Sequence, residues 1–147
     1  MEFEELKKLE IMACKIRMYA IEGIYNAKSG HPGGSLSIAD ILSVLYFKEM
    51  KIDENNPLWE DRDRFVLSKG HAAPAYYAAL ALRGFFDLGL IKTLRKIDSP
   101  LQGHPDMTKV KGVDMSTGSL GQGLSVACGM ALYAKKRNKG FRVYSII

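Results

Sequence analysis

Apolar residues recur every three or four positions through the first part of the chain. This spacing predicts a helix over residues 4–27 with one apolar face that packs against a core. We expect the helix to end at residues 29–30, ahead of Pro32, because a residue before proline disfavours helical geometry. The positions that share the spacing are Leu6, Leu9, Ala13, Ile16, Ala20 and Ile24.

A second apolar segment follows and predicts another helix that ends near Phe47. It begins at Ser35 or Ser37, and Ser37 with Asp40 three positions later resembles a capping box with a shorter acid. Residues 53–63 are polar and predict a loop.

Two short apolar runs predict strands. Residues 65–68 suit a buried parallel strand, and residues 141–147 begin a second strand. Helices are predicted over 73–83 and 120–138, with a short one within 88–97, and small apolar residues predict that the 120–138 helix is buried. Strands that alternate with helices indicate an α/β protein with a mostly parallel sheet flanked by helices.

Residues 99–119 carry no strong period and contain several glycines and prolines, so we predict a loop there. A loop of this length in a small domain is usually functional or disordered. It contains His104, one of only three histidines in the chain.

Composition places the chain among ordinary globular proteins. Its 147 residues fit one domain, and 47% are hydrophobic and 25% charged. No apolar run approaches the roughly 20 residues that span a bilayer. The acidic start, residues 1–5, lacks the layout of a signal peptide, and we therefore expect a cytoplasmic protein that binds no membrane.

Charge and cysteine usage add little evidence for special partners. The net charge is +5, but the basic residues are spread along the chain, and the densest run, 135–139, falls at a predicted helix end. We therefore expect no nucleic-acid partner. The alternating charges of residues 61–64 predict a solvated or paired surface strip. Cys14 and Cys128 are expected to be buried as small hydrophobic residues in a reducing compartment.

Each of the three histidines follows a glycine, in a stretch of small residues. His71 comes just after the first predicted strand, where α/β folds bind ligands and where the next helix start can hold a phosphate. A histidine that only caps a turn is the alternative for His71. The histidines lie too far apart in the sequence to match a short metal-ligand signature, and we assign no metal ligand in this chain.

The segment Gly118-Ser119-Leu120-Gly121-Gln122-Gly123 precedes a predicted helix. It matches neither the dinucleotide pattern nor the P-loop pattern, so it is weak evidence for a phosphate site. Its glycines could instead let the backbone approach a flat ring closely. No serine lies in a nucleophile elbow, so nucleophilic catalysis is unsupported.

Four motifs in the chain belong together. They are Ser29-Gly30-His31-Pro32-Gly33, Leu67-Ser68-Lys69-Gly70-His71-Ala72, Gln102-Gly103-His104-Pro105-Asp106 and Ser116-Thr117-Gly118-Ser119-Leu120-Gly121-Gln122-Gly123. In this order they resemble the amino-terminal, diphosphate-binding domain of the transketolases. The resemblance covers essentially the whole chain, is strongest to the split transketolases, whose halves are separate chains, and implies a thiamine diphosphate-binding fold.

The resemblance also implies roles for five residues. His71 would contact the cofactor diphosphate, while Gly118 and Leu120 would lie against the aminopyrimidine, with the Gly118 backbone accepting from its amino group. His31 and His104 would face the sugar phosphate substrate, and His104 suits the hydroxyl next to the donor carbonyl. The implied activity is transfer of a two-carbon ketol unit between sugar phosphates.

In this family a Gly-Asp-Gly motif and a later asparagine hold the Mg2+ ion of the diphosphate, and we expect both beyond Ile147. The pyrimidine-binding domain is also absent from these 147 residues. We therefore interpret residues 1–147 as one incomplete, truncated domain that is inactive alone. It would need a C-terminal transketolase half as a partner, in an oligomer.

Two other interpretations remain open from the sequence. One is a domain of a related thiamine diphosphate enzyme such as deoxyxylulose-phosphate synthase, which resembles the pattern around His104 less well. The other is a non-catalytic truncated module that only binds a partner.

Overall fold

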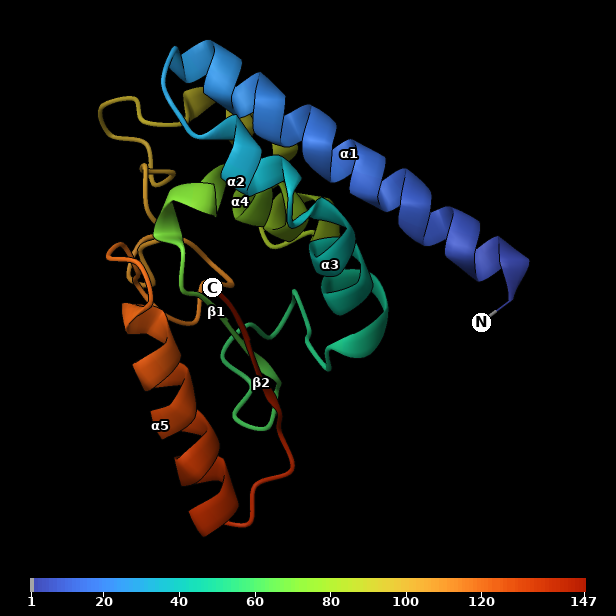
Figure 1. The fold of residues 1–147 in the computed structure, drawn as a ribbon, viewed down its shortest axis with the longest axis vertical. Coiled ribbons are helices and arrows are strands. Elements are labelled where there is room, and N and C mark those ends of the chain that lie inside the picture. The colour runs from blue at the N-terminus through green and yellow to red at the C-terminus, as the bar shows by residue number, and fades with distance from the viewer. Residues whose placement is uncertain (1) are drawn as a thin grey trace.

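The computed structural model describes residues 2–147 and opens with one long helix, α1 (Phe3–Ala27). Its buried positions follow the predicted spacing and lie along one face, which confirms the helix. Lys28 ends it in the left-handed conformation, with φ of 52°. Figure 1 shows α1 crossing the body, with its N-terminal half reaching beyond the other helices. Although α1 is long, no helix in residues 2–147 is both long and apolar enough to span a bilayer.

The helix predicted from Ser35 or Ser37 to about Phe47 is present but begins later, as α3 (Ala39–Val44), which continues directly into the π-helix η1 (Leu45–Glu49). A separate short helix, α2 (Pro32–Leu36), precedes it. Ile38, with φ of −109° and ψ of 1°, interrupts the helical geometry between α2 and α3. Helix α2 was not predicted, and it begins at Pro32, a residue well suited to the first turn of a helix.

The sheet consists of two parallel strands, β1 (Arg64–Leu67) and β2 (Val143–Ile146). Both strands were predicted, and so was their parallel arrangement. Phe65 pairs with Tyr144, and Leu67 with Ile146. After β1 the chain passes through η2 (Gly70–Ala72) into α4 (Ala73–Arg83), which confirms the predicted helix there.

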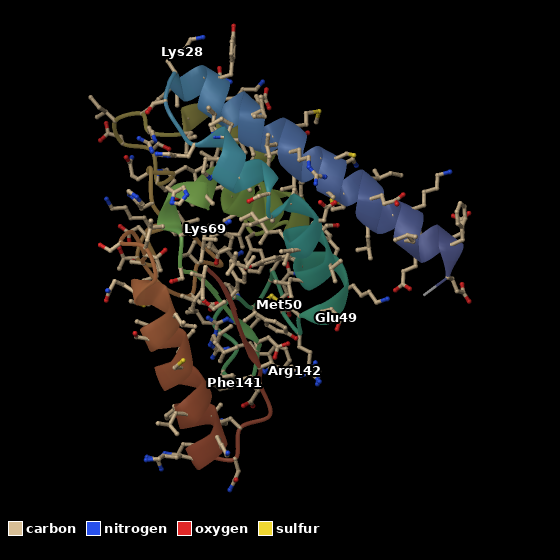
Figure 2. The ribbon with its side chains drawn as sticks, viewed as in Figure 1. Lys28, Glu49, Met50, Lys69, Phe141 and Arg142 are labelled. Atoms are coloured by element: carbon tan, nitrogen blue, oxygen red, sulfur yellow. The ribbon has the colours of Figure 1, made fainter. Side chains whose placement is uncertain are left out.

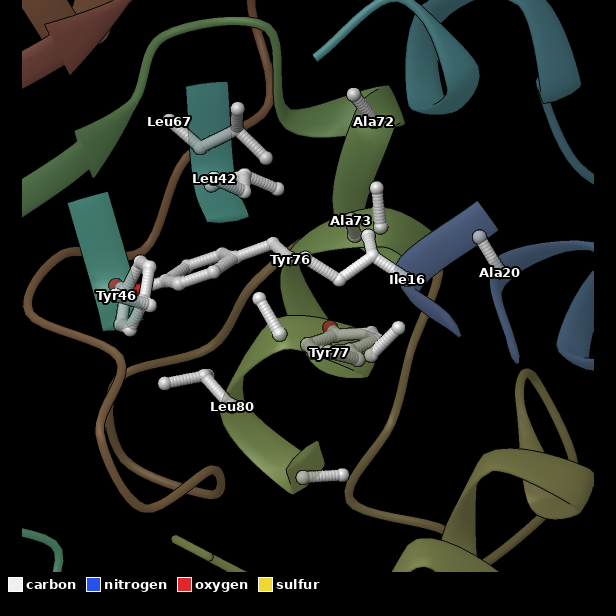
Figure 3. Close-up of a cluster of buried hydrophobic side chains, with 14 of the residues drawn as sticks. Ile16, Ala20, Leu42, Tyr46, Leu67, Ala72, Ala73, Tyr76, Tyr77 and Leu80 are labelled. Atoms are coloured by element: carbon white, nitrogen blue, oxygen red, sulfur yellow. The ribbon is translucent and has the colours of Figure 1, made fainter. Parts of the chain in front are cut away.

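Helix α4 forms the centre of the hydrophobic core, where nine of its residues are buried. Figure 3 shows its tyrosines and leucine among side chains from α1, α3, η1 and β1. Tyr76 packs edge-on against Phe65 of β1, with ring centroids 5.0 Å apart. Because the core surrounds α4, the residues at its N-terminal end are held rigidly. The α4 side chains labelled in the figure are Ala73, Tyr76, Tyr77 and Leu80.

The rest of the chain is less regular. A 3-10 helix, η3 (Leu88–Thr93), stands where a short helix was predicted. Residues 99–119 form neither helix nor strand, as predicted, yet Leu101, Val110 and Val113 are buried. The long loop is therefore fixed to the core by apolar side chains at several points.

Helix α5 (Gln122–Lys136) corrects the prediction of a buried helix. Its only buried residues are Gly123, Ala127 and Ala134, and Tyr133 is 54% exposed. Figure 1 shows the cause: α5 packs on the two strands and stands apart from the other helices, so most of its surface has no neighbour within residues 2–147.

The predicted burial of the two cysteines is also wrong. Cys14 and Cys128 are free and exposed, one on α1 and the other on α5. Both lie on the side of their helix that faces away from the core. Apolar neighbours in the sequence did not distinguish the two faces of these helices.

The predicted surface strip at residues 61–64 is partly internal. Asp63 is only 2% exposed, and its carboxylate accepts hydrogen bonds from the backbone N–H groups of Lys51 (2.9 Å) and Arg142 (2.6 Å). Arg142 lies just before β2 (Figure 2), so Asp63 joins the approaches to both strands. Arg62 makes an ion pair with the buried Asp114.

Candidate functional site

The end of β1 places the second histidine motif next to the glycine-rich loop. Ser68 follows β1, and its hydroxyl accepts a hydrogen bond from the Leu124 N–H at 3.1 Å. The Ser68 carbonyl accepts another from the Gly121 N–H at 3.1 Å. Two bonds from one residue therefore fix the start of α5 beside the turn that carries His71.

The backbone of the turn that carries His71 lies in close contact with the loop before α5, and this contact depends on glycine. A Cβ at Gly70 would lie 2.8 Å from the carbonyl oxygen of Thr117. A Cβ at Gly123 would lie 3.0 Å from the Cα of Ser68. The glycines thus serve the close approach of one loop to the other.

His31 and His71 come together beside α2. Their rings meet edge to face, with centroids 5.1 Å apart. His31 is the residue that precedes α2 and is exposed, whereas His71 is half-buried. A Cβ at Gly34 would lie 2.9 Å from Nε2 of His71, so the α2 backbone passes very close to that nitrogen.

His104 is positioned by α4. The Tyr77 hydroxyl lies 2.9 Å from the His104 carbonyl oxygen and 3.0 Å from that of Gln102. On the other side, the Thr117 N–H donates to the Pro105 carbonyl at 3.3 Å. The His104 ring lies next to Gly118, where an added Cβ would be 3.8 Å from its Cδ2.

Arg95 is a neighbour of this site that the sequence analysis did not single out. Its backbone has a φ of 60°, and its guanidinium packs against Gly103. Nη1 of Arg95 lies 3.3 Å from the Ser29 hydroxyl, so Arg95 connects the first and third histidine motifs. Nothing in the sequence pattern marks it, because it lies in a segment predicted only as a short helix.

A polar hollow of about 580 Å³ opens beside His104. Thr108 hydrogen bonds lower the pKa of Asp106 at this rim, so its carboxylate stays ionised. Arg95 and Ser116 also line the hollow, and its donors and acceptors suit a polyhydroxylated ligand.

The electrostatics around His71 favour an anion. Partial burial lowers the pKa of His71, and the nearby His31, Lys69 and His104 lower it further. All three neighbouring groups carry or can acquire positive charge. Helix α4 begins two residues later, but the Ala73 N–H donates to the Gly70 carbonyl and Pro74 has no N–H, so the positive charge beside His71 comes from these side chains.

The five residues singled out from the sequence fall into three positions. His31 and His71 form one pair, His104 and Gly118 form another, and Leu120 lies 69% exposed just before α5. A Cβ at Gly70 would lie 3.0 Å from the Cα of Gly118, so the turn of His71 and the loop beside His104 belong to one region.

Two buried hydroxyl groups border this region without a hydrogen-bond partner among the described residues. They are Oγ1 of Thr117, next to Gly118, and Oγ of Ser35, next to Gly34. Buried polar groups are usually satisfied, so unpaired ones near a site are consistent with a polar ligand. Within residues 2–147, no three side chains of the metal-binding types gather in one place.

Comparison with known proteins identifies the family. Residues 9–144 match the model of the transketolase, thiamine diphosphate binding domain. The chain belongs to the transketolase family. This confirms the resemblance of the four motifs.

Curated transketolases of both single-chain and subunit type are similar to this chain. The 6-deoxy-6-sulfo-D-fructose transketolase subunit SqwG of Clostridium sp. (strain MSTE9) is 49% identical over 98% of this chain and 52% of the relative. A subunit of the apulose-4-phosphate transketolase of Phocaeicola vulgatus is 40% identical over 97% of this chain and 50% of the relative. Human transketolase is 44% identical over 98% of this chain, but the match covers only 23% of its own length.

Solved transketolase structures share the fold. Transketolase from Leishmania mexicana matches with a TM-score of 0.88 and 34% identity, over 93% of this chain and 22% of that one. The Campylobacter jejuni transketolase matches with a TM-score of 0.87 and 36% identity, over 99% and 23%. The predicted α/β thiamine diphosphate-binding fold is thus confirmed. The chain spans about half of the subunit-type transketolases and about a quarter of the single-chain ones.

Proposed function

We propose that the chain forms the diphosphate-binding part of a transketolase that transfers a two-carbon ketol unit between sugar phosphates. The observation that carries the proposal is the convergence of three histidines from three distant segments on the Gly118–Gly123 loop. Each histidine sits on a turn that the core or another loop holds in place. The family match over residues 9–144 supports the cofactor assignment.

The residues present fit thiamine diphosphate. His71 and the cationic groups beside it suit the diphosphate. The Gly118 backbone is accessible for a hydrogen bond to the aminopyrimidine, and the exposed Leu120 side chain offers an apolar surface for a flat ring. When bound, the cofactor supplies the nucleophilic carbon on which the ketol unit is carried.

His31 and His104 act on the substrate in this proposal. Both imidazoles are exposed, and both lie close to His71 or Gly118, where the cofactor would bind. His104 donates a hydrogen bond to the hydroxyl next to the donor carbonyl. His31 holds or transfers a proton at the carbonyl oxygen as charge develops there.

Residues 1–147 then form one incomplete domain and not a whole active site. We place the Mg2+ ligands and the pyrimidine-binding domain outside these residues, the second on a C-terminal partner half within an oligomer. The names of two similar transketolases, each called a subunit, support a two-chain arrangement. Two free, exposed cysteines suit a reducing compartment such as the cytoplasm.

The test mixes the chain with the C-terminal half of a split transketolase, thiamine diphosphate and Mg2+. Xylulose 5-phosphate and ribose 5-phosphate are supplied, and the new ketose phosphate is measured. We expect no ketol transfer by the chain alone, transfer by the mixture, and a large loss for His31→Ala and His104→Ala. Ile97→Ala, at a 93% exposed position outside the four motifs, is the matched control. Equal activity of the histidine variants and the control would overturn the proposed roles.

A further inference from the structure

We propose that Lys69 provides a second cationic contact for the cofactor diphosphate and that Ser37 holds its ammonium in position. The inference rests on the proposed function, because it concerns the same anion site as His71. Lys69 would be a binding residue, and Ser37 a positioning residue that acts through it.

Lys69 reaches from one side of the site to the other. It lies at the turn after β1 (Figure 2), two residues before His71, and is half-buried. Its Nζ lies 3.3 Å from the hydroxyl oxygen of Ser37, which follows α2. The lysine therefore connects the same two segments that bring His31 and His71 together.

The Ser37 hydroxyl is itself oriented. It donates a hydrogen bond to the Gly34 carbonyl at 3.0 Å, which leaves its oxygen lone pairs free to accept from Lys69. Gly34 is also the residue whose backbone passes next to Nε2 of His71. One short segment, residues 34–37, thus positions both the lysine and the histidine.

The charge of Lys69 has no counter-ion within residues 2–147. No carboxylate there comes within ion-pair distance of its ammonium, whereas Lys48, Lys92 and Lys139 are all paired. The groups that influence His71 are also cationic and include Lys69 itself. An ammonium on a half-buried residue beside two imidazoles is suited to an anion of more than one negative charge.

A diphosphate meets this requirement better than a single carboxylate. Lysine binds phosphate oxygens as a point charge, without the planar geometry that favours arginine for carboxylates. Neutral His71 can donate one N–H while Lys69 supplies charge from the side of Ser37. The site would then bind the diphosphate through two different kinds of donor.

The first test follows the imidazole resonances of the full chain by NMR during titration with inorganic diphosphate. We expect Lys69→Met to weaken binding about 10- to 100-fold and Ser37→Ala to weaken it less, about 3- to 10-fold. Lys69→Arg keeps the charge and should retain most of the affinity. Lys111→Met removes an exposed lysine that is not among the groups that lower the His71 pKa, and it is the control.

The second test measures the pKa of His71, which Lys69 would not change if its role were only structural. Removing the Lys69 charge should raise the pKa of His71 in the free chain, because a like charge that lowers it is gone. Lys111→Met should leave this pKa unchanged. An unchanged His71 pKa in a folded Lys69→Met chain would contradict the placement of the ammonium.

The third test separates this inference from the proposed function. In the mixture with the partner half, thiamine diphosphate and thiamine are compared as ligands by calorimetry. Lys69→Met should weaken only the ligand that carries the diphosphate. Binding of thiamine diphosphate by the wild type with no loss in Lys69→Met overturns the lysine assignment alone. No binding by the wild type overturns both proposals.

Discussion

The phenol oxygen of Tyr77 lies 2.9 Å from the backbone oxygen of His104. Tyr77 is fully buried in the middle of α4, whereas His104 is exposed on the long loop. Burial raises the pKa of Tyr77, so the hydroxyl stays protonated and donates. A core side chain therefore fixes the turn that carries His104, the histidine that we propose faces the substrate.

Replacing Tyr77 by phenylalanine should loosen this turn without emptying the core. The change removes the hydroxyl that serves the carbonyls of Gln102 and His104, and we expect a loss of about 1–2 kcal/mol in the free energy of unfolding. Urea denaturation measures the loss, and the imidazole resonance of His104 should broaden or shift.

The control for that prediction is Tyr76→Phe. Tyr76 is the preceding residue of α4 and also donates to a loop carbonyl, that of Gly112, at 3.2 Å. The Tyr76→Phe variant should lose a similar amount of free energy of unfolding but leave the His104 resonance unchanged. An identical His104 spectrum in both variants would show that Tyr77 does not control the turn.

The sequence predicted the elements that depend on local periodicity. Helices α1 and α4 and both strands carry apolar residues at spacings that identify them directly. The order of the four motifs was enough to predict the family. His31 follows α1 and His71 follows β1, so the positions of these two turns follow from the elements beside them, whereas His104 lies on the long loop and is held by contacts with distant residues.

The sequence failed where a residue's surroundings come from distant parts of the chain. The buried Asp63 looked like one of four alternating surface charges, because its two N–H partners, Lys51 and Arg142, are far away in sequence. The exposure of α5 and Cys128 could not be predicted either, since periodicity does not reveal how many neighbours a helix has.

Asp63→Ala should be strongly destabilising. Its carboxylate accepts from two backbone N–H groups that would be left without it, and hydrogen bonds to a charged group contribute about 1.5–3 kcal/mol each. We expect the free energy of unfolding to fall by about 3–5 kcal/mol in urea denaturation. Asp61→Ala, which removes an exposed carboxylate paired with Lys139, should change it by less than about 1 kcal/mol. Comparable losses in the two variants would refute the internal role of Asp63.

Gly70 and Gly33 offer a matched pair of glycines on the two sides of the site. At Gly70 a Cβ would meet the Thr117 carbonyl oxygen at 2.8 Å, so Gly70→Ala must displace the loop that carries Gly118. We expect a loss of about 1–3 kcal/mol and weaker binding of thiamine diphosphate in the assembled protein.

At Gly33 an added Cβ meets nothing within 4 Å. Gly33→Ala should therefore be neutral or stabilise the chain by up to about 1 kcal/mol, because alanine favours the helix. Both variants are compared by thermal unfolding and calorimetry. If Gly70→Ala behaves like Gly33→Ala, the close approach of the two loops is not needed.

His71 should make the stability of the chain depend on pH in the acidic range. Burial and the nearby cationic groups lower its pKa below the ordinary value of 6.5, whereas the unfolded chain keeps that value. Between the two values the unfolded state binds more protons, so stability rises with pH. Protonation of His71 therefore costs no stability above pH 6.5. Below that pH, the free energy of unfolding falls as the pH drops toward the lowered pKa of His71 in the folded chain.

Urea denaturation between about pH 7.5 and about 5 measures this slope. His71→Gln removes the titrating group and should flatten the slope, whereas Ile97→Ala should leave it unchanged. Inorganic diphosphate should stabilise the wild type more at low pH than at high pH, because its negative charge favours the imidazolium of His71. A wild-type slope that persists in His71→Gln would assign the proton uptake to another group.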